Sequence, residues 1–140
     1  MNWKRFALCA LMVFVAQAVV AGTLQVIVLD PLFEEQTFFR PEGREKLVPY
    51  FASRVLFVGL FTYLFARACR RSGWVEGLRY GIVIWLFYSI PMTVGFWSFI
   101  TMPDGLAVAW IAVGLAEYVV SGVLLGVLYR TSGVKEMGMP

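Results

Sequence analysis

The sequence predicts an all-α membrane protein whose four transmembrane helices form one domain over residues 1–140. Hydrophobic residues make up 60% of the chain and charged residues only 15%. A soluble domain of this length cannot bury so much apolar surface, because small domains leave much of their surface in water. The hydrophobic residues also fall into four runs, each near or above the roughly 20 residues that a helix needs to cross a bilayer. The runs cover residues 6–29, 50–68, 80–102 and 106–129.

Basic residues at the ends of these runs predict that both termini lie in the cytoplasm. Lys4 and Arg5 precede the first run, arginines end the second, and Arg130 and Lys135 follow the fourth. Lys and Arg next to membrane helices are retained on the cytoplasmic side. We therefore expect a multi-pass protein of the bacterial cytoplasmic (inner) membrane. The formal net charge of +3 is not clustered on a polar scaffold, so no nucleic-acid partner is expected.

The first run follows a short basic segment and is expected to end at Asp30-Pro31. A cleaved signal peptide starts in the same way, but its apolar region has only about 7 to 15 residues. The first run is longer than that, so we expect residues 6–29 to stay in the protein as a transmembrane helix.

An acidic outer loop is predicted over residues 31–48. Together with Asp30 it holds five acidic and three basic residues. We interpret it as a solvated connection with membrane-anchoring aromatic residues in preference to a binding loop. Pro49 follows at the expected start of the second helix, where a proline breaks no intrahelical hydrogen bond.

The third and fourth runs carry residues with special backbone roles. Pro91 lies in the middle of the third run and leaves the carbonyl of Phe87 without its usual donor, so a helix kink is expected there. Residues 103–105, Pro-Asp-Gly, are expected to form a tight outer turn. In the fourth run, Gly122 and Gly126 form a G-x-x-x-G pattern, which allows two helices to approach closely. We expect it to pack inside the bundle in preference to forming a dimer interface.

The two halves of the chain indicate an internal repeat. Arg5 and Asp30 bracket the first run with the same separation as Arg79 and Asp104 around the third. Residues Arg-Arg-Ser-Gly end the second run, and Arg-Thr-Ser-Gly follow the fourth. These matches predict two copies of one helical hairpin, related by an axis along the membrane normal.

An ion pair between Arg54 and Glu117 is predicted inside the membrane. Glu117 is the only carboxylate within residues 106–129, and an ionised carboxylate at that depth costs a few kcal/mol unless it is paired. Counted at about 1.5 Å per residue, Glu117 lies ~20 Å outward of Arg130 and Arg54 ~24 Å outward of Arg70. Their similar depth places the two side chains within reach of one another.

A polar pocket is predicted around this pair. Its candidate members, besides the pair itself, are Gln17, Tyr88, Thr93 and Ser121. The alternative is that the same polar network only fixes the register of the helices.

Little in the sequence points to catalysis. The chain has no histidine, which removes the commonest general base and a common metal ligand. Cys9 and Cys69 have no partner ligands nearby and are interpreted as packing residues. Paired carboxylates, a nucleophile beside a base and phosphate-binding glycine loops are also missing. We therefore expect no catalytic residues, no metal and no cofactor.

Three short motifs carry a family resemblance. They are residues 76–81 (EGLRYG), 90–92 (IPM) and 122–130 (GVLLGVLYR). In these motifs the chain resembles small four-helix inner-membrane proteins of bacteria, chiefly in its second half. The resemblance implies the same fold and membrane location, and the group brings no established activity.

The leading functional hypothesis is a non-catalytic accessory or assembly subunit of a membrane complex, or a self-associating structural protein. Its expected partners are the lipid bilayer and either other membrane subunits or further copies of itself. The alternative is a small transporter or channel that uses Glu117 as a protonatable or cation-binding group, as intramembrane carboxylates often do.

Overall fold

The computed structural model describes residues 3–33, 46–69 and 73–129. Within them the chain is helical apart from short connections, and four helices are long and apolar enough to cross a membrane. The four spans are Trp3–Leu32, Leu47–Ala68, Trp74–Phe99 and Asp104–Leu128. The predicted all-α fold with four candidate transmembrane helices is confirmed at this level.

Two of the spans consist of several helical segments. The first contains α1 (Trp3–Leu24), the π-helical segment η1 (Gln25–Leu29) and α2 (Asp30–Phe33). The third contains α4 (Trp74–Ile84), the π-helical segment η2 (Trp85–Ser89) and α5 (Ile90–Phe99). The other two spans are the continuous helices α3 (Leu47–Ala68) and α6 (Asp104–Leu128).

Segment η1 carries the first helix past a proline. The N–H of Asp30 donates to the carbonyl of Gln25, so this hydrogen bond reaches one residue farther back than in an α-helix. Pro31 follows and has no N–H, and its ring would clash with a carbonyl in a regular α-helical turn. A wider π turn just before the proline relieves the crowding. The prediction that Asp30-Pro31 ends the helix is therefore wrong, since α2 continues to Phe33.

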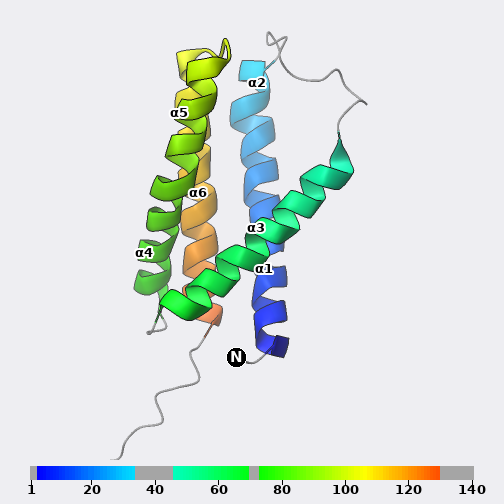
Figure 1. Cartoon of the computed structure of the whole chain (residues 1–140), viewed down its shortest axis with the longest axis vertical. Coiled ribbons are helices and arrows are strands. Elements are labelled where there is room, and N and C mark those ends of the chain that lie inside the picture. The colour runs from blue at the N-terminus through cyan, green and yellow to red at the C-terminus, as the bar shows by residue number, and fades with distance from the viewer. Residues whose placement is uncertain (1–2, 34–45, 70–72, 130–140) are drawn as a thin grey trace, which may run out of the picture.

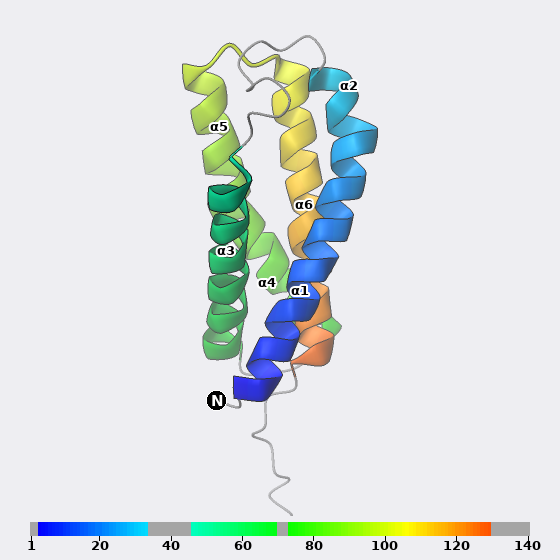
Figure 2. The same cartoon turned by 90° about the vertical axis from the view of Figure 1, so that its right-hand side faces the viewer.

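The third span also has a π-helical segment just before its proline. The N–H of Ile90 donates to the carbonyl of Trp85, and Pro91 follows directly. The irregularity expected at Pro91 thus falls mainly in the five residues of η2. In Figure 2, α4 and α5 differ in direction on either side of it.

The ends of the helices differ from the predicted runs. The third helix begins at Trp74 and not at residue 80, because Gly73 turns the chain with a φ of 148° and Glu76 suits the positive end of the helix dipole. It ends at Phe99 and not at residue 102, since Ile100 is extended. Of the predicted outer loop 31–48, residues 34–45 lie outside the described residues.

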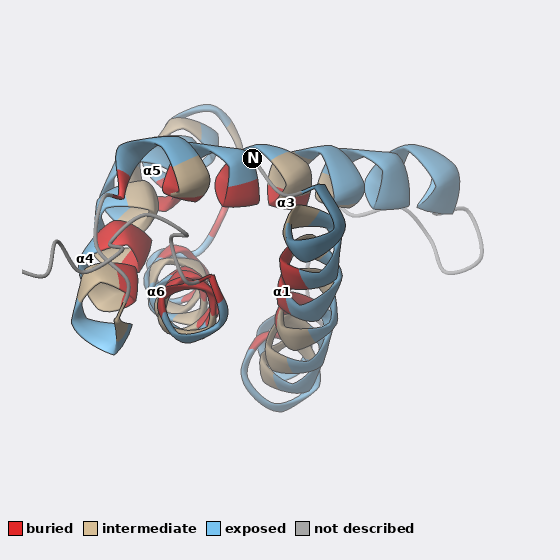
Figure 3. Ribbon diagram, turned by 90° about the horizontal axis from the view of Figure 1, so that it is seen from below, coloured by how far each residue is buried: buried red, intermediate tan, exposed pale blue. Residues whose placement is uncertain are grey.

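Helix α6 lies between α1 on one side and α4 with α5 on the other (Figures 1 and 3). Helix α3 crosses this layer obliquely. Its Ala68 end lies beside α4, whereas its Leu47 end projects past α1 and is exposed (Figure 3). The start of α1 and the end of α6 lie at the same end of the bundle (Figure 1). The hairpin repeat stays a prediction, and its two aspartates differ in setting, because Asp30 lies inside a continuous helical span whereas Asp104 begins α6.

The tightest contact in the described chain is the glycine seam, formed by Gly77 and Gly81 of α4 with Gly122 and Gly126 of α6. A Cβ atom on any of the four would overlap backbone atoms of the facing segment. The N–H of Gly73 also donates to the carbonyl of Gly126 over 2.8 Å. Small residues in membrane helices allow such backbone contact. The prediction that Gly122 and Gly126 pack inside the bundle is confirmed.

Candidate functional site: an ion pair beside an open groove

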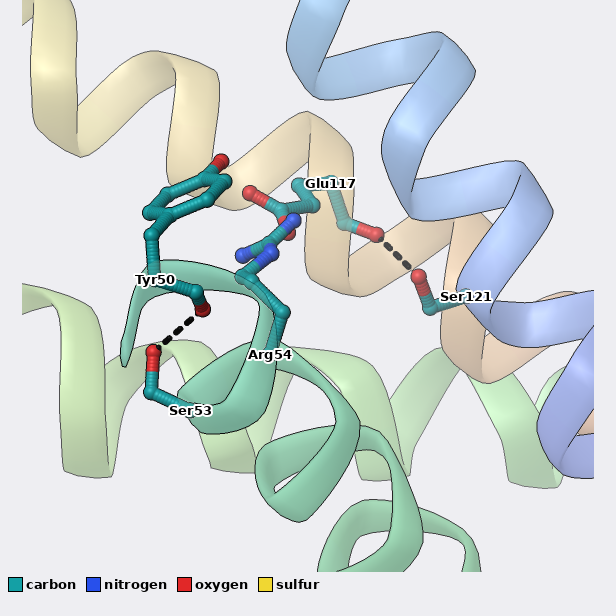
Figure 4. Close-up of polar contacts among 5 residues, drawn as sticks. All are labelled: Tyr50, Ser53, Arg54, Glu117 and Ser121. Carbon is teal, nitrogen blue, oxygen red and sulfur yellow. Dashed lines mark hydrogen bonds and ion pairs between the residues drawn. The ribbon is translucent and has the colours of Figure 1, made fainter. Parts of the chain in front are cut away.

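The central position of α6 accounts for the burial of Glu117. This residue is 7% exposed, and Gly114 and Ser121, about one turn away on either side, are buried with it. The hydroxyl of Ser121 donates to the backbone carbonyl of Glu117 over 2.7 Å (Figure 4). Ser121 therefore bonds along its own helix, a common solution for serine inside a helix.

The oblique crossing of α3 brings Arg54 to this carboxylate. The Arg54 Nη2 group donates to Glu117 Oε1 over 2.5 Å (Figure 4). The Arg54 side chain is 22% exposed and that of Glu117 is 9% exposed. A charge-assisted hydrogen bond of this kind is stronger than a neutral one and compensates each charge for its loss of water.

An aromatic layer covers the pair toward the Ala68 end of α3. The Phe57 ring lies 5.3 Å from that of Tyr88 and 5.6 Å from that of Tyr118, centroid to centroid. Farther along, the Tyr80 hydroxyl donates to the backbone carbonyl of Phe61 over 2.6 Å. Aromatic rings at such separations pack favourably. They close the bundle on this side of the pair.

The other side of the pair is open. A groove of about 570 Å³ runs between α1 and the first half of α3. We call it the α1–α3 groove. Its lining includes Phe14, Ala18, Gly22 and Gln25 from the first span, and Tyr50 and Arg54 from α3. Arg54 thus belongs both to the buried ion pair and to the wall of an accessible groove.

The structure does not assemble the predicted polar pocket as one site. Tyr88 is 40% exposed, and its ring packs in the aromatic layer against Phe57 and Tyr118. Thr93 lines a separate cavity of about 210 Å³ with Trp97 and Asp104, near the start of α6. The reason is the register of the helices: Ser89 already lies beside Gly114, and Thr93 is one turn farther from Glu117.

Gln17 is placed in the interior, but without a partner. It is 1% exposed, and neither its amide nitrogen nor its amide oxygen has a hydrogen-bond partner in the described part of the chain. A buried amide in this condition is unfavourable, and more so where lipid replaces water.

Several contacts were not anticipated from the sequence. Trp85 Nε1 donates to the carbonyl of Ile111 over 2.9 Å, and Trp97 Nε1 donates to Asp104 over 2.9 Å. The α4 side of the glycine seam was also missed, although a signal existed. Gly73, Gly77 and Gly81 recur at every fourth residue, the same spacing that drew attention to α6.

The chemistry that the ion pair offers is electrostatic. Among residues 3–33, 46–69 and 73–129, no cluster of His, Cys, Asp and Glu could hold a metal ion. The pair offers one guanidinium and one carboxylate that neutralise each other. Such a pair can hold helices in register or present the arginine to a group in the groove. Comparison with models of protein families, with curated proteins and with solved structures finds no match.

Proposed function

We propose that the chain is a non-catalytic accessory or assembly subunit of a complex in the bacterial cytoplasmic membrane. The observation that carries the proposal is the position of α3. Its Leu47 end projects past α1, and apolar side chains in the first half of the helix are strongly exposed, with Val48 at 82% and Val55 at 60%. A helix end that packs little within its own chain is suited to packing against another membrane protein, where contact area stabilises association.

The proposed topology has both termini in the cytoplasm. Lys4 and Arg5 lie at the start of α1, and Arg67 and Arg79 lie near the end of α3 and the start of α4. All four positions belong to the end of the bundle where α6 also ends (Figure 1). Asp30 and Asp104 lie near the other end. This asymmetry supports the orientation, because Lys and Arg are retained on the cytoplasmic side.

The ion pair favours an assembly role over the transporter or channel hypothesis. A carboxylate that binds a cation or carries a proton must be able to lose its partner. Arg54 already compensates the charge of Glu117 over 2.5 Å. A cation entering this position would have to displace the guanidinium or lie beside another positive charge.

The test is a gentle affinity purification of tagged protein from native membranes, followed by mass spectrometry and measurement of particle mass. We expect a larger membrane protein in stoichiometric amount. A photoreactive residue at Val55 should cross-link to it, whereas one at Val108, equally apolar and 67% exposed on α6, should cross-link far less.

Purification of the chain alone would contradict the proposal. Equal cross-linking from Val55 and Val108 would contradict the choice of α3 as the contact surface. In the first case, flux assays on liposomes with the natural protein and Glu117→Gln would test the transporter hypothesis, which requires the substitution to abolish transport.

A further inference from the structure

We propose that one end of the bundle binds anionic phospholipid head groups through Lys4, Arg5, Arg67 and Arg79. We call it the basic end. All four side chains are exposed, and they lie where α1 begins, α3 ends and α4 begins (Figure 1). The bilayer itself supplies the ligand, so the inference needs no partner subunit. It rests on the proposed topology only in placing these lipids in the cytoplasmic leaflet.

Charge is distributed unevenly over the described part of the chain. The basic end has four basic side chains and one acidic side chain, Glu76. Away from this end lie two acidic residues, Asp30 and Asp104, and one basic residue, Lys46. The buried ion pair between α3 and α6 is neutral as a whole. The excess positive charge at the basic end therefore attracts anionic lipids, and each Lys or Arg near a membrane surface raises the affinity about fivefold.

The basic end can bind phosphate because acidic side chains do not neutralise it. Neither Lys4 nor Arg79 has an ion-pair partner among the described residues, and Glu76, three residues before Arg79, forms no salt bridge with it. Arg67 Nε donates to the Tyr63 hydroxyl over 3.2 Å, and the guanidinium lies over the Tyr63 ring. This contact positions the guanidinium and leaves its two Nη groups for a pair of phosphate oxygens.

The depth of the basic end in the membrane also fits a lipid head group. Trp3 is 69% exposed and Trp74 is 61% exposed, at the first residues of α1 and α4. Tryptophan is enriched at the level of the head groups because its ring is amphipathic. Arg79 lies about 8 Å of helical rise from Trp74, and a long basic side chain can extend that far toward the membrane surface. Lipid phosphates are the anions that are concentrated at this depth.

The experiment uses the full chain in vesicles with equal amounts of phosphatidylglycerol and phosphatidylethanolamine, extracted mildly and measured by native mass spectrometry. We expect retained phosphatidylglycerol to exceed phosphatidylethanolamine at least about tenfold, since several cations contribute. Arg67→Met and Arg79→Met should each lower this ratio about fivefold, and the double variant should lower it more than tenfold. Lys46→Met is the control. It removes a cation roughly 30 Å along α3 from Arg67, and should change the ratio less than about twofold because of screening.

Further controls separate lipid binding from misfolding and from binding of free phosphate. Each variant should keep the helical circular dichroism and thermal transition of the natural chain, and Arg67→Gln replaces Arg67→Met if the latter does not fold. Arg67→Lys keeps the charge and should lose less than Arg67→Met. Inorganic phosphate should displace no more phosphatidylglycerol than chloride of equal ionic strength does.

Four outcomes would overturn the proposal: the natural chain retains both lipids equally, the double variant keeps the ratio of the natural chain, Lys46→Met loses as much as Arg67→Met, or free phosphate displaces the lipid at equal ionic strength. None of these outcomes bears on the proposed function, which is tested separately by cross-linking from Val55.

Discussion

The two sides of α6 are packed by different means. Toward α4, the glycine seam brings backbone against backbone, and no side chain separates the helices at Gly77 and Gly122. Toward α3, contact depends on an ion pair and on aromatic rings, and beyond Arg54 the α1–α3 groove opens between α3 and α1. The interface of α6 with α4 is closed because glycines have no side chains, whereas the interface of α6 with α3 is held by long side chains.

This difference suggests separate roles for the two sides of α6: the α4 side stabilises the fold, and the α3 side is available for binding. Backbone contact at the seam leaves no space for a ligand and fixes the position of α4 on α6. The α3 side has a charged group next to accessible space, which is the condition for recognising another molecule. A membrane protein of this size can thus hold one helix pair rigidly and leave another helix available for its surroundings.

Breaking the ion pair is the change with the largest expected effect. Glu117→Gln and Arg54→Met should each lower the free energy of unfolding by about 3 kcal/mol, because each leaves one charged group without its partner in a low-dielectric interior. The double variant should lose less than the sum of the two, which measures the coupling. Reversible unfolding in mixed detergent micelles provides the measurement.

Arg67→Met is the matched control for this cycle. Arg67 lies on the same helix and is exposed. Its Nε donates to the Tyr63 hydroxyl over 3.2 Å, and its guanidinium lies over the Tyr63 ring. Its removal should change the unfolding free energy by no more than about 0.5 kcal/mol. Strict additivity of the Arg54 and Glu117 losses would show that the pair contributes no coupling.

Overpacking the glycine seam should have the next largest effect. Gly77→Val places a branched side chain where the backbone of Gly122 already lies, and should destabilise the protein by about 2 to 3 kcal/mol. Gly59→Val on α3 is the control, since an added Cβ there meets nothing within 4 Å. It should change stability by about 0.5 kcal/mol or less. Equal losses in the two variants would mean that α4 and α6 do not approach as closely as described.

The fold was largely accessible from the sequence because apolar length decides the number of spans. The pair of Arg54 and Glu117, which the structure places in contact, was accessible for a related reason: a lone carboxylate in an apolar helix calls for a partner at its own depth. Depth along a helix can be counted from the sequence.

Rotation about the helix axes and helix crossing cannot be counted in this way. Thr93 was predicted to join the pocket as a polar residue of the third helix, but the register of the helices places it in a separate cavity with Trp97 and Asp104. The groove could not be foreseen, because it results from the tilt of α3. The continuation of the first helix through Pro31 depends on a π turn, which has no simple sequence signal.

Removing the unpartnered amide of Gln17 is the change with the smallest expected effect, and it tests how closed the interior around α6 is. Gln17→Met keeps the length of the side chain and removes two polar atoms that have no partner in the described chain. It should raise the free energy of unfolding by about 1 kcal/mol, since an unsatisfied buried polar group costs roughly that much or more. The measurement is the same detergent unfolding curve.

Gln25→Met is the control, because the Gln25 amide donates to Asp30 over 3.1 Å and lines the groove. This variant should gain no stability, since it loses a bond as well as a polar group. If Gln17→Met instead destabilised the protein, the Gln17 amide would have to be satisfied in the membrane by a bound molecule such as water. The closed interior around α6 would then contain a polar site of its own, and the contrast between its closed and open sides would be smaller than the backbone packing indicates.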